Sequence, residues 1–167
     1  ADVPASCQLA EDAWTRAINA VLPPSIRILK AEPAGGSFHA RYDAKAKVYR
    51  YRIWRRHVMS PFEVGRSWHV YGPLDEEALA RCAALLPGTH NFSRLSANRG
   101  HTSEEARREN PDDMTRTLSR VELRTEDDVT EIEFEGDGFL YKMVRLMVGS
   151  LIHVARGRES AEWFESL

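Results

Sequence analysis

The chain has 167 residues, of which 43% are hydrophobic and 29% are charged, and this composition is that of one ordinary globular domain. Its two cysteines are too few for a disulfide framework or a zinc site, which favours a reducing compartment. The longest apolar stretch, residues 139–155, carries Lys142, Arg145 and His153, so the sequence predicts no membrane-spanning segment. We therefore expect a single domain over residues 1–167, located in the cytoplasm, with an organelle as the alternative.

The first part of the chain predicts one helix and two strands. Residues 12–21 have apolar side chains at helical spacing, and Pro23 and Pro24 end this helix. Residues 26–31 predict a short strand. Residues 47–55 alternate strictly and give the clearest strand pattern in the chain. One side of this strand is expected to carry Val48, Arg50, Arg52 and Trp54, and the other Lys47, Tyr49, Tyr51, Ile53 and Arg55.

The rest of the chain predicts three helices, two strands and one loop. The expected helices are residues 73–86, 139–155 and 160 onward, the expected strands are 117–124 and 129–135, and the polar segment 96–113 is expected to be an exposed loop. Helices and strands in this order indicate an α+β domain with a mainly antiparallel sheet, covered by helices on one side.

The formal net charge is only −2, but the charges are unevenly distributed. Residues 41–56 contain seven basic residues and one acid, whereas residues 101–137 contain thirteen acids and five arginines. We call the first set the basic strip; it consists of Arg41, Lys45, Lys47, Arg50, Arg52, Arg55 and Arg56. A basic strip is compatible either with phosphate binding or with a solvated face of the protein.

Arg145 is the most informative single residue, because apolar side chains surround it in the predicted helix 139–155. We expect this arginine to be almost fully buried, and a buried guanidinium needs an anionic partner. One interpretation is a structural ion pair or a side chain whose charged end reaches water; the other is an active-site arginine that positions an anion. The nearest local carboxylate, Asp137, is a weak partner because it is expected to cap the start of the helix.

Several segments in order along the chain closely resemble the tRNA pseudouridine synthase A family. Each would be weak evidence alone, but together they occur at family-like separations over nearly the whole chain. They are Asn19-Ala20-Val21-Leu22-Pro23, Phe38-His39-Ala40-Arg41, Lys47-Val48-Tyr49-Arg50-Tyr51, Leu86-Pro87-Gly88-Thr89-His90-Asn91-Phe92-Ser93, and Gly138-Phe139-Leu140-Tyr141-Lys142-Met143-Val144-Arg145 with Val148-Gly149.

The resemblance implies a pseudouridine-synthase-like fold and an enzyme that isomerises uridine in the tRNA anticodon arm, at tRNA positions 38–40, without metal or organic cofactor. It implies a homodimer for the full-length protein. Tyr49 matches the tyrosine that stacks on the flipped uracil, and Arg145 matches the arginine that pairs with a nucleophilic aspartate. The basic strip, His90 and Phe139 are the expected RNA contacts.

One departure from the family pattern concerns the nucleophile. The family's aspartate lies in an Arg-Thr-Asp-Ala-Gly-Val-His-like segment of an N-terminal domain, and no segment of this chain matches it. Asn91 also stands where the family usually has aspartate. We therefore expect the chain to correspond to the second half of the enzyme and to be inactive by itself. The alternative is a non-catalytic RNA-binding or assembly module with the same fold.

Overall fold

The computed structural model describes residues 10–97 and 114–167, so most of the predicted loop 96–113 lies outside the described residues. The chain divides into two units, residues 1–44 and 45–167, and each is described by itself. The expectation of one domain over the whole chain stays a prediction. Among the described residues, no helix is both long and apolar enough to cross a bilayer.

The first unit contains helix α1 (Glu11–Val21), as the sequence predicts. The predicted strand at residues 26–31 is wrong, because this segment pairs with no strand of the part of the chain that the structure describes. The amide side chain of Asn19 takes the place of a strand partner: its Nδ2 donates to the carbonyl of Ile28, and its Oδ1 accepts from the amide of Ile28, both at 2.8 Å. Both backbone groups of Ile28 are thus satisfied without a sheet.

The second unit is built on a five-stranded sheet in the order β2-β1-β5-β4-β3. Strands β1 and β2 run parallel, whereas β1 with β5, β5 with β4, and β4 with β3 are antiparallel. The strands are β1 (Lys47–Trp54), β2 (Trp68–His69), β3 (Gly88–Asn91), β4 (Thr115–Glu126) and β5 (Val129–Gly136). The predicted mainly antiparallel sheet is confirmed, and the two short strands β2 and β3 were not predicted.

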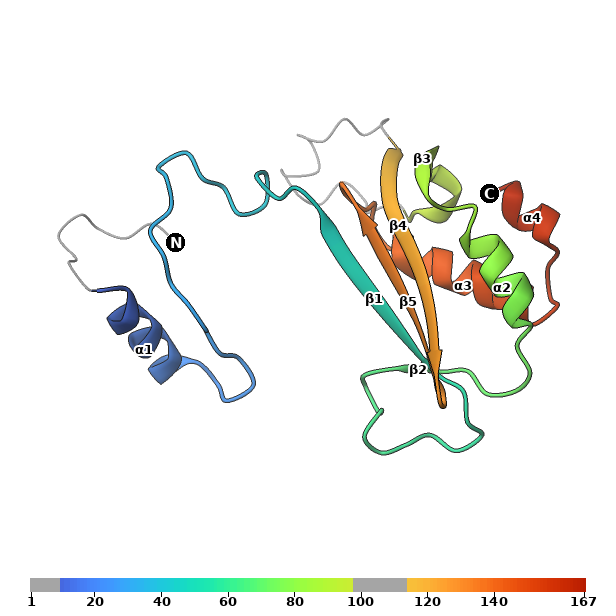
Figure 1. Cartoon of the computed structure of the whole chain (residues 1–167), viewed down its shortest axis with the longest axis horizontal. Coiled ribbons are helices and arrows are strands. Elements are labelled where there is room, and N and C mark those ends of the chain that lie inside the picture. Colours follow the sequence, from blue (N-terminus) through green and yellow to red (C-terminus); the bar gives the residue numbers. More distant parts are fainter. Residues whose placement is uncertain (1–9, 98–113) are drawn as a thin grey trace. The chain divides into compact units, whose positions relative to one another are not determined.

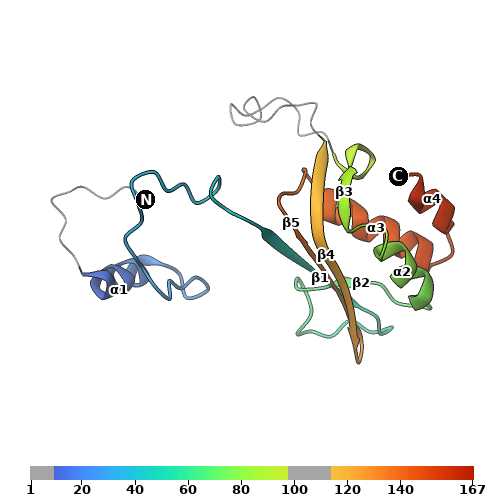
Figure 2. The same ribbon diagram turned by 45° about the horizontal axis from the view of Figure 1, so that its top comes forward.

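Helices cover one face of this sheet, which confirms the predicted α+β architecture. They are α2 (Glu76–Ala83), α3 (Met143–Ala155) and α4 (Ala161–Glu165), and a short 3₁₀ helix, η1, spans Ser93–Leu95. Figures 1 and 2 both show α2, α3 and α4 on the same side of the sheet. Fully buried side chains of the sheet (Ile53, Ile132 and Phe134) and of α3 (Met143 and Met147) form the centre of the core. The apolar side of the alternating β1 pattern therefore faces the helices.

The start of α3 differs from the sequence prediction. The helix begins at Met143, four residues later than expected, because Lys142 has a left-handed backbone with φ 60° that is incompatible with a continuous helix. The expected cap is also wrong. The Oδ1 of Asp137 accepts a hydrogen bond from the amide of Thr117 at 3.2 Å, which ties the end of β5 to β4, and no side chain caps α3.

Candidate active site

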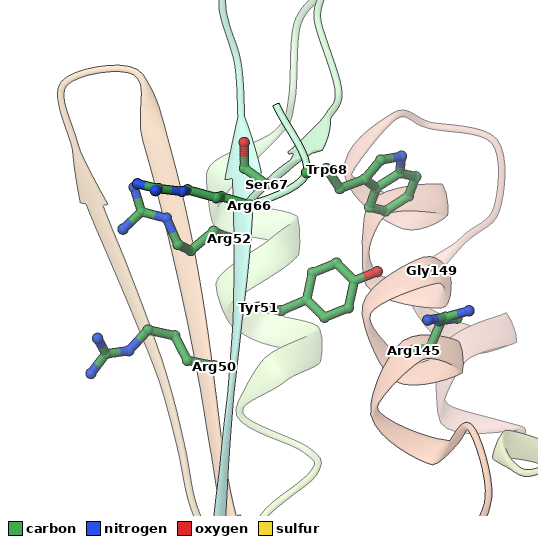
Figure 3. A pocket seen from close by; sticks show the side chains of 9 residues that line it. Arg50, Tyr51, Arg52, Arg66, Ser67, Trp68, Arg145 and Gly149 are labelled. Carbon is green, nitrogen blue, oxygen red and sulfur yellow. The ribbon is translucent and has the colours of Figure 1, made fainter. Parts of the chain in front are cut away.

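A pocket of about 600 Å³ lies along β1, beside the short strand β2 and helix α3. Its wall consists of Arg50, Tyr51, Arg52, Gly65, Arg66, Ser67, Trp68, Arg145 and Gly149. Figure 3 shows Tyr51 extending from β1 toward α3, where Arg145 and Gly149 lie, whereas Arg50 and Arg52 extend from the opposite side of the strand. Arg145 lies on the helix side of β1, and no acidic residue is part of the described pocket wall, so this side offers an anion a site between a sheet and a helix.

Arg145 lies in the first turn of α3 and is exposed, so the expectation of nearly complete burial is wrong. Successive helical residues are about 100° apart, which puts Arg145 about 200° from both Met143 and Met147, the residues that face the core. Arg145 therefore lies on the face of α3 that is turned away from the core, and it is part of the pocket wall. Among the described residues it has no ion pair or hydrogen bond, in contrast to most arginines of the sheet.

Tyr49 and Tyr51 lie on the same side of β1 as the buried Ile53, because side chains alternate along a strand. The ring of Tyr49 contacts the ring of Phe139 edge to face, with centroids 4.9 Å apart, and 48% of Tyr49 is exposed. Tyr51, rather than Tyr49, lies on the wall of the pocket beside Arg145. Tyr49, the tyrosine that the resemblance predicted, thus lies on the same side of β1 as Tyr51. It contacts Phe139, another predicted RNA contact.

Four arginines of the basic strip are paired with carboxylates. Arg50 Nη2 lies 2.9 Å from Glu133, Arg52 Nη1 lies 2.6 Å from Glu131, and Arg52 Nη2 lies 2.9 Å from Glu63. Arg55 pairs with Glu76, and Arg56 pairs with Asp128. The basic strip and the acidic segment are separate in the sequence, but β1 and β5 are neighbours, and their charges largely cancel.

Glu133 is the centre of the charged network on the helix-free face of the sheet. Its carboxylate accepts hydrogen bonds from Arg50 of β1 and from Arg120 of β4, at 2.9 and 2.6 Å. These two hydrogen bonds hold the pKa of Glu133 below its ordinary value. The same hydrogen bonds raise the pKa of Arg50 and of Arg120. This face is therefore a set of mutual ion pairs and not an uncompensated phosphate-binding surface.

The remaining predicted RNA contacts lie in different places. Lys45, which precedes β1, and Lys47, its first residue, have no carboxylate partner among the described residues. His90 lies on β3, at the opposite end of the sheet order from β1, and its ring nitrogen lies 3.1 Å from the carbonyl oxygen of Pro87. Arg41 belongs to the first unit and lies over the ring of Tyr42. The structure does not bring His90 to the pocket.

Sequence reasoning named neither Tyr51 nor Gly149 as a site residue, and it also missed four further residues of the pocket wall: Gly65, Arg66, Ser67 and Trp68. They lie in or beside β2, a strand of only two residues that pairs with Ile53 and Trp54 of β1. Two residues are too few to produce a periodic pattern, so no signal in the sequence could have placed this segment next to β1.

Residues 82–167 match the family described as tRNA pseudouridine synthase. The chain is 40% identical over 151 residues to the tRNA pseudouridine synthase A of Halalkalibacterium halodurans, which covers 90% of this chain and 54% of that protein. It is 38% identical over 162 residues to the tRNA pseudouridine synthase A of Akkermansia muciniphila, with 97% of this chain and 60% of that protein covered.

The fold, the cationic pocket and these matches define the class. The described residues form an α+β sheet that helices cover on one face, with a pocket beside it that Arg145 lines. The chain belongs to the tRNA pseudouridine synthase family. It spans a little more than half the length of the curated relatives that it matches.

Proposed function

We propose that this chain forms part of a cytoplasmic, homodimeric tRNA pseudouridine synthase that isomerises uridine in the anticodon arm of tRNA. The observation that supports this most directly is Arg145. It is an exposed arginine at the family's arginine position, it lies on a pocket wall, and no carboxylate partners it among the described residues. In the family that the chain resembles, the arginine at this position pairs with a nucleophilic aspartate.

The proposed chemistry divides between this chain and a segment that supplies the aspartate. The reaction breaks the bond between N1 of uracil and C1′ of ribose, forms a bond between C5 and C1′, and releases the C5 hydrogen as a proton while N1 gains one. Arg145 would hold the aspartate ionised and in position, and Tyr49 would offer a ring to the flipped base. No residue of the described pocket wall can act as the carboxylate.

Tritium release from tRNA labelled at C5 of uridine tests this proposal. We expect no release from the 167-residue chain alone. Release is expected when the chain is fused to the N-terminal part of the Halalkalibacterium halodurans relative, where the resemblance places the aspartate. In that fusion, Arg145→Ala and Tyr49→Ala should each reduce the rate by several orders of magnitude. Arg158→Ala, which removes an exposed arginine outside the pocket, is the matched control.

The alternative is a non-catalytic RNA-binding or assembly module, and the lack of a carboxylate on the described pocket wall favours it. A fusion that binds the anticodon arm but releases no tritium would support the module and contradict the enzyme. Robust release by the isolated chain would mean that a carboxylate of this chain is itself the nucleophile.

A further inference from the structure

Gly149 lies in the middle of α3, one helical turn after Arg145, and lines the same pocket. Glycine inside a helix is less stable than alanine because its unfolded backbone has more freedom. Glycine would be required if another segment of the protein packed too close to the helix to leave room for a side chain. However, a Cβ added at Gly149 meets no atom within 4 Å. By contrast, a Cβ at Gly136 would lie 2.6 Å from the carbonyl oxygen of Thr117. At Gly149, the packing of the described residues therefore does not require glycine.

Trp68 is the second unusual residue of the pocket wall. Its side chain is 38% exposed, and its ring meets that of Tyr51 edge to face with centroids 6.4 Å apart. The indole nitrogen of Trp54 donates to the carbonyl of Val58 at 2.8 Å, but that of Trp68 has no hydrogen-bond acceptor among the described residues. A large ring with an unused donor, held on the wall of a pocket, is suited to contact a flat polar ligand.

Arg145 adds positive charge to this space. Its guanidinium has no ion-pair partner among the described residues, and Figure 3 shows it on the same side of β1 as Tyr51 and Trp68, whereas Arg66 extends with Arg52 on the other side. A cavity of about 600 Å³ is large enough for one nucleotide. An indole, one unpaired cation and an open helix surface together match the parts of a nucleotide: a flat base and an anionic phosphate.

We infer that Trp68 and Gly149 determine whether a uridine nucleotide fits beside Arg145: Trp68 stacks on the nucleotide, and the missing side chain of Gly149 leaves the room that the nucleotide occupies. The inference rests on the proposed function for the identity of the base. It does not depend on turnover, because binding of a single nucleotide requires no nucleophile.

The test is a ¹⁹F NMR titration of the 167-residue chain labelled with 5-fluorotryptophan, using uridine 5′-monophosphate as the probe. The four tryptophans give four signals, and Trp68→Phe identifies that of Trp68. We expect the signal of Trp68 to shift with millimolar nucleotide while that of Trp163 stays in place. Uridine and inorganic phosphate, titrated separately, distinguish recognition of the base from recognition of the phosphate.

Substitutions then test each residue. Gly149→Leu should abolish the shift, whereas His153→Leu, at an exposed position one turn further along α3 and outside the pocket, should leave it unchanged. Ligand-observed titrations should show binding at least about tenfold weaker for Trp68→Ala and within about threefold of the original for Trp68→Phe, which keeps a ring. Circular dichroism verifies that each variant is folded.

Three outcomes would overturn the inference. The first is no shift of Trp68 at any nucleotide concentration, and the second is an unchanged shift in Gly149→Leu. The third is a shift of Trp68 only when the N-terminal part of the Halalkalibacterium halodurans relative is added without nucleotide, which would mean that a protein segment fills the space. Tritium release is measured separately, so the proposed function and this inference can fail independently.

Discussion

Arg50 of β1 lies directly opposite Glu133 of β5, and its Nη2 is 2.9 Å from Glu133 Oε2. Arg120 of β4 binds the other carboxylate oxygen at 2.6 Å, so one glutamate joins three strands of the sheet. This arrangement explains why a basic and an acidic segment of the sequence do not produce a basic and an acidic surface. It also makes Glu133 the ionisable residue whose replacement should have the clearest pH dependence.

Glu133→Gln should lower the melting temperature at pH 7 by at most about 4 °C, because partly exposed ion pairs contribute little to stability. The pKa of Glu133 is lowered in the folded protein, so its contribution is complete above the ordinary pKa of glutamate. It is lost as the pH falls through the lower folded pKa. Thermal unfolding between pH 7 and pH 3 should therefore show the difference shrinking at acid pH.

The control for this measurement is Glu126→Gln. Glu126 lies at the end of β4 and has no ion pair among the described residues, so its replacement should change the melting temperature little at any pH. A difference for Glu133→Gln that is constant from pH 7 to pH 3 would contradict a role of the ionised carboxylate.

Gly136→Ala should destabilise the fold by about 1–3 kcal/mol, because the new methyl group would lie 2.6 Å from the carbonyl oxygen of Thr117. That oxygen is part of the backbone of β4 and cannot move away easily. Gly138→Ala is the matched control, since its added Cβ would meet only the Arg116 side chain, at 3.6 Å. Urea unfolding measures both; equal stabilities would show that β4 shifts without penalty.

Sequence periodicity predicted the elements that bury one face against the core. The resemblance predicted Arg145 and Tyr49 as site residues, and Arg145 lies on the pocket wall whereas Tyr49 does not. The alternation of β1 and the apolar face of α3 follow from burial, and both are present. The failures have local causes. Asn19 satisfies the backbone of Ile28 in place of a strand, and Lys142 delays the start of α3. Arg145 is exposed because its side chain lies on the face of α3 that is turned away from the core. Its apolar neighbours in the sequence do not reveal on which face of the helix it lies.

Arg145→Ala should leave the stability of the chain unchanged within about 0.5 kcal/mol. The residue is exposed and has no ion pair among the described residues, so its removal leaves neither a cavity nor an unpaired carboxylate. The control is Met147→Ala, at a fully buried position of the same helix, which should cost about 2–5 kcal/mol. A large loss in Arg145→Ala would indicate a structural role in place of the proposed catalytic one.

The salt dependence of RNA binding should separate the unpaired cations of the basic strip from the paired ones. Each phosphate contact releases counterions, so the logarithm of the binding constant falls with the logarithm of salt concentration by about 0.7–0.9 per contact. Lys45 and Lys47 have no carboxylate partner among the described residues, whereas Arg50 and Arg52 are held by Glu133, Glu131 and Glu63. Lysines without a competing carboxylate are free to contact phosphates, and each such contact releases counterions from the RNA.

We therefore expect the double variant Lys45→Ala/Lys47→Ala to flatten the slope for a tRNA anticodon arm by about one to two. Arg50→Ala/Arg52→Ala removes the same number of charges from the same segment but should leave the slope almost unchanged, because these guanidiniums already bind protein carboxylates. Filter-binding titrations between about 50 and 200 mM salt measure both slopes. A larger effect of the arginine pair would mean that RNA displaces the carboxylates, and the charged face of the sheet would then itself be an RNA contact.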